Sequence, residues 1–158
     1  MATNDQRPTT NDLMRIAMNC AKRAAAHDDV PIGAVVVAGG RVIARGENRV
    51  QIGRDPTLHA EIVAMRRACR KLGRKFLDDC EIYVTLEPCA MCAAAISFAR
   101  IGRVVFAARD AKGGGILHNA KIYETDRHLF RPAVAEMPEF ADESSAMLKN
   151  FFKGKRDK

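Results

Sequence analysis

The stretch that most constrains the fold is the run from residue 81 to 108. EIYVTL at 81–86 and RVVFAA at 103–108 are short apolar segments typical of buried strands, and the alanine-rich stretch at about 89–100 between them is typical of a helix. Two strands joined through a helix form a right-handed parallel crossover in nearly all known cases. The sequence therefore predicts a sheet with helices on both faces.

The rest of the chain adds an antiparallel pair and further helices. Two apolar runs around Gly39-Gly40 predict a hairpin, because both glycines accept positive φ. Helices are expected at 11–28, at about 58–72 and at 142–153. Thr10 or Asn11 is the expected cap of the first helix, and Thr57 that of the second. The region 111–135 has no clear assignment. The expected fold is an α/β, three-layer α/β/α sandwich with a mixed sheet.

Length and composition indicate one domain. A chain of 158 residues suits a single core, which we place at 11–153, between a flexible tail at 1–10 and a basic tail at 154–158. No apolar run approaches the roughly 18 residues that cross a bilayer, and the polar start is unlike a signal peptide. We therefore expect a cytoplasmic protein that does not contact membranes.

The five cysteines favour metal chemistry over disulfides. Their number is odd and nothing suggests export, so a metal or catalytic role is the better interpretation of any paired set. Cys20 and Cys69 fall on apolar helix faces and are expected to be buried thiols, and Cys80 is expected at a strand edge. Cys89 and Cys92 are three residues apart at a predicted helix start, where the helix dipole favours thiolates.

Two thiolates do not complete a zinc site, and His59 is the best candidate for a third ligand. Structural zinc usually has four protein ligands, whereas three leave a position for water, whose pKa zinc lowers to about 7. Glu61 follows two residues after His59 and can move protons without binding the metal. This requires His59 to lie at the first turn of its helix, because positions two apart in a regular helix point to opposite sides.

H-x-E followed by P-C-x-x-C is the signature of zinc nucleobase deaminases. Each half alone is weak, since an isolated CxxC is as often redox-active or structural. Together, with a strand leading into the PCxxC helix, the two halves favour a catalytic zinc over a purely structural one.

Longer stretches of the sequence point to one family of deaminases. VPIGAVVV, GENR, DPTLHAEIVAMR, YVTLEPCAMCAAAI and ARIGRVVFAARDAKGG resemble the bacterial tRNA-specific adenosine deaminases, within the cytidine and deoxycytidylate deaminase superfamily. The resemblance implies a five-stranded sheet, a homodimer, one Zn²⁺ per subunit on His59, Cys89 and Cys92, and Glu61 as proton shuttle. It implies hydrolysis of the wobble adenosine of a tRNA anticodon to inosine, with release of ammonia and without an organic cofactor.

Further substrate-binding residues follow from the same resemblance. Asn48 matches a position whose amide contacts the target base, although a turn asparagine would look the same. Asp110 matches a position near the substrate's sugar, or is a solvated loop acid. Arg131 is assigned a phosphate contact. Phe151 belongs to an aromatic-basic run that either stacks on bases or packs its Phe side on the sheet.

Two other functions remain open from the sequence. A deaminase of a free nucleobase or nucleoside, of the guanine or cytosine type, would use the same zinc and glutamate without needing a basic surface. An inactive zinc-stabilised RNA-binding module would have no use for Glu61. The net charge of +7 suits a polyanionic substrate such as the anticodon stem-loop of a tRNA, or is an ordinary basic surface.

Overall fold

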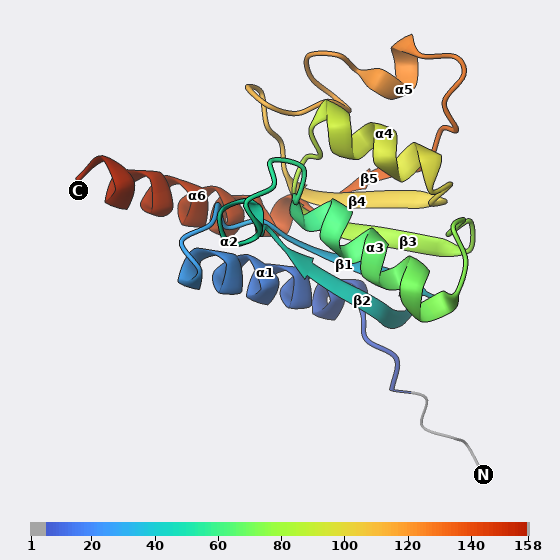
Figure 1. Cartoon of the computed structure of the whole chain (residues 1–158), viewed down its shortest axis with the longest axis horizontal. Helices are drawn as coiled ribbons and strands as arrows, with labels where there is room; N and C mark the ends of the chain where they lie inside the picture. Colours follow the sequence, from blue (N-terminus) through green and yellow to red (C-terminus); the bar gives the residue numbers. More distant parts are fainter. Residues whose placement is uncertain (1–5, 158) are drawn as a thin grey trace.

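A five-stranded mixed sheet forms the centre of the molecule (Figure 1), in a computed structural model that describes residues 6–157. The strands lie in the order β2-β1-β3-β4-β5. Their bounds are β1 (Gly33–Ala38), β2 (Arg41–Glu47), β3 (Cys80–Leu86), β4 (Arg103–Ala108) and β5 (Ala133–Glu136). β1 pairs antiparallel with β2 and β3, and β4 pairs parallel with β3 and β5, so the predicted mixed sheet is confirmed.

Six α-helices and a 3-10 turn accompany the sheet in the described part of the chain. They are α1 (Thr10–Ala26), α2 (Val50–Gly53), α3 (Ala60–Leu72), α4 (Ala90–Phe98), α5 (Ile122–Thr125), η1 (Pro138–Phe140) and α6 (Ala141–Arg156). α3 and α4 cover one face of the sheet, and α1 with α6 lies on the other (Figure 1). The α/β/α sandwich predicted from the sequence is confirmed.

Alternating side chains divide the core into two layers. On β3, Ile82 and Val84 face α3 and α4, whereas Tyr83 faces α1. The alternation follows from the period of two residues in a strand. A strand whose two faces are both covered contains an unbroken apolar run, which is the pattern that made 81–86 and 103–108 recognisable.

Two glycines allow helices to approach the sheet closely. A Cβ added at Gly33 would lie 2.0 Å from the backbone oxygen of Ala17 in α1, and one at Gly46 would lie 2.4 Å from the backbone oxygen of Ala60 in α3. The predicted hairpin turn is confirmed, since Gly39 and Gly40 have φ of 57° and 76°.

Several helix boundaries differ from the sequence predictions. α1 is capped by Thr9, in a capping box with Asp12, because this pair satisfies two backbone donors where Thr10 or Asn11 would satisfy fewer. The last helix does not end at residue 153 but continues to Arg156. Its last turn contains three basic residues, whose positive charges stabilise the negative, C-terminal end of the helix dipole. Residues 154–156, assigned to a tail, are therefore helical, and residues 1–5 of the other tail lie outside the described residues.

The region 111–135 contains structure that the sequence did not reveal. α5 and the beginning of β5 lie in it, and three of the four β5 side chains are exposed.

All five cysteines are unpaired. Cys20 and Cys80 are buried, whereas Cys69 is only partly buried, because it lies at the margin of the α3–α4 face. Within residues 6–157, no helix has the length and apolar character needed to span a bilayer.

Candidate metal centre

His59 lies at the start of α3 and outside the regular helix. It is the N-cap residue, with extended φ and ψ of −68° and 157°. This is the condition under which Glu61, in the first helical turn, can point to the same side as His59. Asn48, at the end of β2, fixes this helix start, because its side-chain oxygen accepts a 2.8 Å hydrogen bond from the backbone N–H of Ala60.

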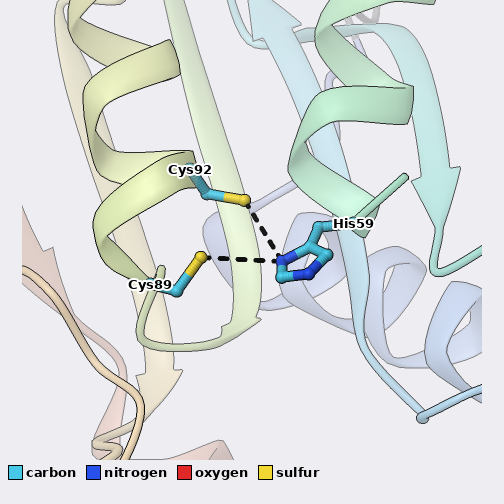
Figure 2. Close-up of side chains that lie close together, drawn as sticks. All are labelled: His59, Cys89 and Cys92. Carbon is cyan, nitrogen blue, oxygen red and sulfur yellow. Dashed lines mark hydrogen bonds between the residues drawn. The ribbon is translucent and has the colours of Figure 1, made fainter. Parts of the chain in front are cut away.

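Cys89 occupies the same position in α4 that His59 occupies in α3. It is the N-cap residue, with φ and ψ of −68° and 173°, and Cys92 lies in the first turn. Pro88, which precedes Cys89, disfavours helical backbone in the residue before it. The helix therefore cannot extend back toward β3, and it begins directly after Cys89. Because α3 and α4 lie side by side on the same face, their N-termini bring three donor side chains together (Figure 2).

The spacing of these donors fits zinc. Cys89 Sγ lies 3.6 Å and Cys92 Sγ 3.5 Å from His59 Nδ1, and the three donor atoms lie within 4.8 Å of one another (Figure 2). Tetrahedral zinc with its usual bond lengths requires a sulfur-to-nitrogen separation of about 3.6 Å. Two thiolates and one imidazole are also among the donors that zinc prefers.

The pKa values of the two cysteines are shifted in opposite directions. A hydrogen bond from Cys92 lowers the pKa of Cys89 to about 4, with the nearby His59 acting in the same direction. The same hydrogen bond, together with burial, raises the pKa of Cys92. The lowered pKa of Cys89 favours its thiolate, the form that binds metals, and a metal held through both sulfurs would require Cys92 to lose its proton.

Glu61 is a buried carboxyl beside this group. Only 3% of its surface is exposed, and burial raises its pKa, with the negative charge of Cys89 acting in the same direction. Among the described residues, the candidate ligand group consists of His59, Cys89 and Cys92 and does not include Glu61. A carboxyl with a raised pKa can hold and release a proton close to neutral pH.

Comparison with known proteins agrees with this geometry. The model of the MafB19-like deaminase family matches residues 9–156. A tRNA-specific adenosine deaminase of Agrobacterium fabrum is 46% identical over 145 residues, covering 91% of this chain and 94% of the relative. One of Aquifex aeolicus is 40% identical over 145 residues, covering 92% and 95%.

The chain belongs to the tRNA-specific adenosine deaminase family. Among solved structures, one from studies of A-to-I editing by tRNA:A34 deaminases is 46% identical, with a TM-score of 0.79, and covers 80% of this chain and 98% of that one. A guanine deaminase of Bacillus subtilis is 42% identical with a TM-score of 0.62, covering 64% of this chain and 65% of that one. The resemblance inferred from the sequence motifs is confirmed.

The other site residues predicted from the resemblance lie at different places relative to the three candidate ligands, which we call the metal group. Asn48 is buried next to it, with its side-chain oxygen already used by α3. Asp110 is partly exposed at the end of β4, where its carboxylate accepts from the N–H groups of Lys112 and Gly113. It also lines a cavity of about 610 Å³ between this loop and α6, with four cationic side chains in the wall: Arg109, Lys112, Lys149 and Arg156.

Phe151 and Arg131 are further from the metal group. Phe151 is half-buried on α6, packs edge-on against Phe152 at 5.4 Å, and faces Gln51 and Ile52 across a second cavity. Arg131 is exposed and follows Phe130, whose carbonyl accepts from Ser97 near the C-terminal end of α4. The structure therefore does not bring Arg131 to the metal group, which lies at the other end of α4.

Sequence reasoning missed one site residue, Glu87. Its side chain is fully buried between β3 and the Cys89 turn. Burial raises the pKa of Glu87, but hydrogen bonds from His118 and from backbone amides outweigh this effect and lower it. The available signal was an acidic residue between a buried strand and the PCxxC motif. His118 and Asn119 could not be placed from the sequence, and in the structure they hold the loop beside Glu87.

Proposed function

We propose that this protein hydrolyses the wobble adenosine of a tRNA anticodon to inosine with the help of zinc. The observation that carries this proposal is the three-donor group at the starts of α3 and α4, with a buried acid beside it. In the reaction, water adds to C6 of adenine, the C6–N bond breaks, and ammonia leaves.

His59, Cys89 and Cys92 would hold one zinc ion per subunit. When bound, zinc supplies a Lewis acid that lowers the pKa of water to about 7. The negative charge of the two sulfurs is favoured by the α4 N-terminus, and the ring of His59 is held by the extended backbone before α3.

Glu61 is the proposed proton shuttle. Its burial keeps it away from bulk water and raises its pKa, so it can take a proton from the attacking water and give it to the leaving amine. Asn48 holds the start of α3, and its remaining amide donor is our candidate for contact with the base.

The cavity lined by Asp110 suits RNA better than a free base. The cavity beside Asp110 combines four cations with an apolar floor that includes Phe152. Cations bind phosphates, which a free nucleobase lacks, and an aromatic ring can stack on an unpaired base. We assign a substrate contact to Asp110 on this ground, one to Phe151 because it belongs to the aromatic-basic run at the end of the chain, and a phosphate contact to Arg131 on resemblance alone.

The direct test is incubation of the purified protein with total tRNA and, in parallel, with free guanine, cytosine and their nucleosides. We expect inosine at the wobble position of tRNA, detected by nucleoside mass spectrometry and sequencing. Deamination of a free base, with unmodified tRNA, would overturn the proposal and favour the guanine or cytosine alternative.

We also propose that the single domain at 11–153 acts as a homodimer in the cytoplasm, where its tRNA substrate lies. The exposed α3–α4 face suits a second copy, because Phe98 is 70% exposed beside a groove lined by Ile62, Met65 and Ala95. Sedimentation of the wild type and of Phe98→Glu tests this interface. A wild-type monomer at micromolar concentration would contradict it.

A further inference from the structure

Glu87 is a buried carboxylate that collects hydrogen bonds from one distant loop. Its Oε2 accepts from the backbone N–H groups of Ile116, Leu117 and His118, at 3.3, 3.0 and 3.3 Å. Its Oε1 pairs with His118 Nδ1 at 2.8 Å and accepts from the N–H of Asp110 at 3.2 Å. A carboxylate offers acceptor sites on both oxygens, so one side chain can bind both ends of the loop.

The loop from 110 to 118 is also pressed against the turn that carries Cys89. The N–H of Gly115 donates to the carbonyl of Pro88 at 2.8 Å. A Cβ at Gly114 would lie 2.2 Å from Glu87 Oε2, and one at Gly115 would lie 2.4 Å from the backbone nitrogen of Ala90. The loop, the carboxylate and the start of α4 therefore form one closely packed unit.

We propose that Glu87 is a positioning residue that fixes loop 110–118 against the metal-binding turn and so places Asp110 for the substrate. The inference rests on the proposed function, because it assigns Asp110 to the RNA. Glu87 acts through the loop and does not itself touch the substrate, since its side chain is fully buried.

The geometry indicates what a glutamine would lose at this position. An amide has the same shape as the carboxylate, but only one of its two terminal atoms accepts hydrogen bonds. If its oxygen stays with the N–H groups of Ile116, Leu117 and His118, its NH₂ group replaces Oε1 and faces both His118 Nδ1 and the N–H of Asp110. That end of the loop then loses its acceptor, whereas Cys89 and Cys92 are unchanged.

The test compares wild type, Glu87→Gln and, as a matched control, Glu124→Gln, which makes the same change at an exposed position on α5. Zinc content, amide hydrogen exchange, and kcat and KM on an anticodon stem-loop are measured. For Glu87→Gln we expect normal zinc content, faster exchange at the amide of Asp110, and a KM raised about tenfold with a smaller change in kcat. Glu124→Gln should match the wild type.

The KM-against-kcat split separates positioning from a merely structural role. If Glu87 only stabilised the fold, its substitution would reduce the active fraction and thus the apparent kcat, without changing KM. Unchanged KM and unchanged exchange in Glu87→Gln would overturn the inference. If the wild type forms no inosine, the proposed function fails instead, and the exchange data still test whether Glu87 holds the loop.

A milder variant keeps the test decisive if Glu87→Gln does not fold. His118→Ala removes one donor to Glu87 from a side chain that is 30% exposed and leaves the three backbone bonds in place. A raised KM with faster exchange at 116–118 would support the inference. Wild-type KM and exchange would overturn it.

Discussion

On the proposed mechanism, a single carboxyl, Glu61, separates a hydrolytic zinc site from a structural one. We expect Glu61→Ala to retain zinc and fold, because the three candidate ligands are elsewhere, and to lose several orders of magnitude in turnover as proton transfer disappears. Zinc analysis, circular dichroism and inosine formation check this. Turnover close to that of the wild type would remove Glu61 from the mechanism.

Cys89, unlike Glu61, is a candidate zinc ligand, so replacing Cys89 should change the metal content. We expect Cys89→Ser to lower bound zinc per subunit, because a hydroxyl is a much weaker zinc ligand than a thiolate. Elemental analysis after dialysis gives the result, with Cys69→Ser as control, since Cys69 lies partly buried at the other end of α3. Unchanged zinc in Cys89→Ser would mean that the ligands are assigned wrongly.

The candidate ligands could be predicted from their local spacing in the sequence. Glu87 could not, because its partners have no such spacing. His59, Cys89 and Cys92 belong to short motifs at helix starts, so their residue types and spacing indicate their chemistry. The donors to Glu87 come from residues 23 to 31 positions further along the chain, in a loop without periodicity. No pattern near Glu87 could predict which segment would return to it.

At the scale of elements, α3 depends on Gly46 for its place on the sheet. A Cβ there would meet the backbone oxygen of Ala60 at 2.4 Å, directly after His59. We expect Gly46→Ala to lower the free energy of unfolding by about 1–3 kcal/mol and also to reduce zinc content, because the start of α3 must shift.

Gly33→Ala provides the matched comparison for Gly46→Ala. Its Cβ would clash with α1, which carries no candidate ligand, so stability should fall while zinc content per folded subunit stays the same. Chemical denaturation and elemental analysis measure both quantities. Equal zinc content in the two variants would contradict the role given to Gly46.

The mixed sheet and its covering layers could be predicted because the central strands are apolar on both faces. β5 could not, since it has four residues, lies at the sheet edge and is mostly exposed, with no alternation to recognise. The end of α6 was placed too early for a similar reason. Its last turn is basic and polar, and the sequence alone does not show whether such a turn continues a helix.

For the whole molecule, the net charge of +7 and the cationic cavity wall imply binding that depends on salt. We expect the affinity for an anticodon stem-loop to fall as salt rises, with a log–log slope of roughly −0.7 to −0.9 per phosphate contact. Lys149→Gln should reduce the slope by about one contact, whereas Lys71→Gln, in the last turn of α3, should not.

Fluorescence anisotropy at several salt concentrations gives these slopes. A flat response in the wild type, together with good turnover of free guanine, would favour a nucleobase substrate. The 42% identity to a guanine deaminase makes this comparison necessary.

The two helices at the metal centre begin without a side-chain cap of their own, because His59 and Cys89 make no capping hydrogen bond. At α3 an oxygen from another element, Asn48 Oδ1, accepts from the first helical N–H, while the N-cap side chains His59 and Cys89 are turned toward one another (Figure 2). A zinc ion held by both helix starts would therefore join two otherwise separate elements, so we expect chelation to depress the melting temperature as well as abolish turnover. On this proposal, the thermal stability of the protein would depend on the zinc available to it.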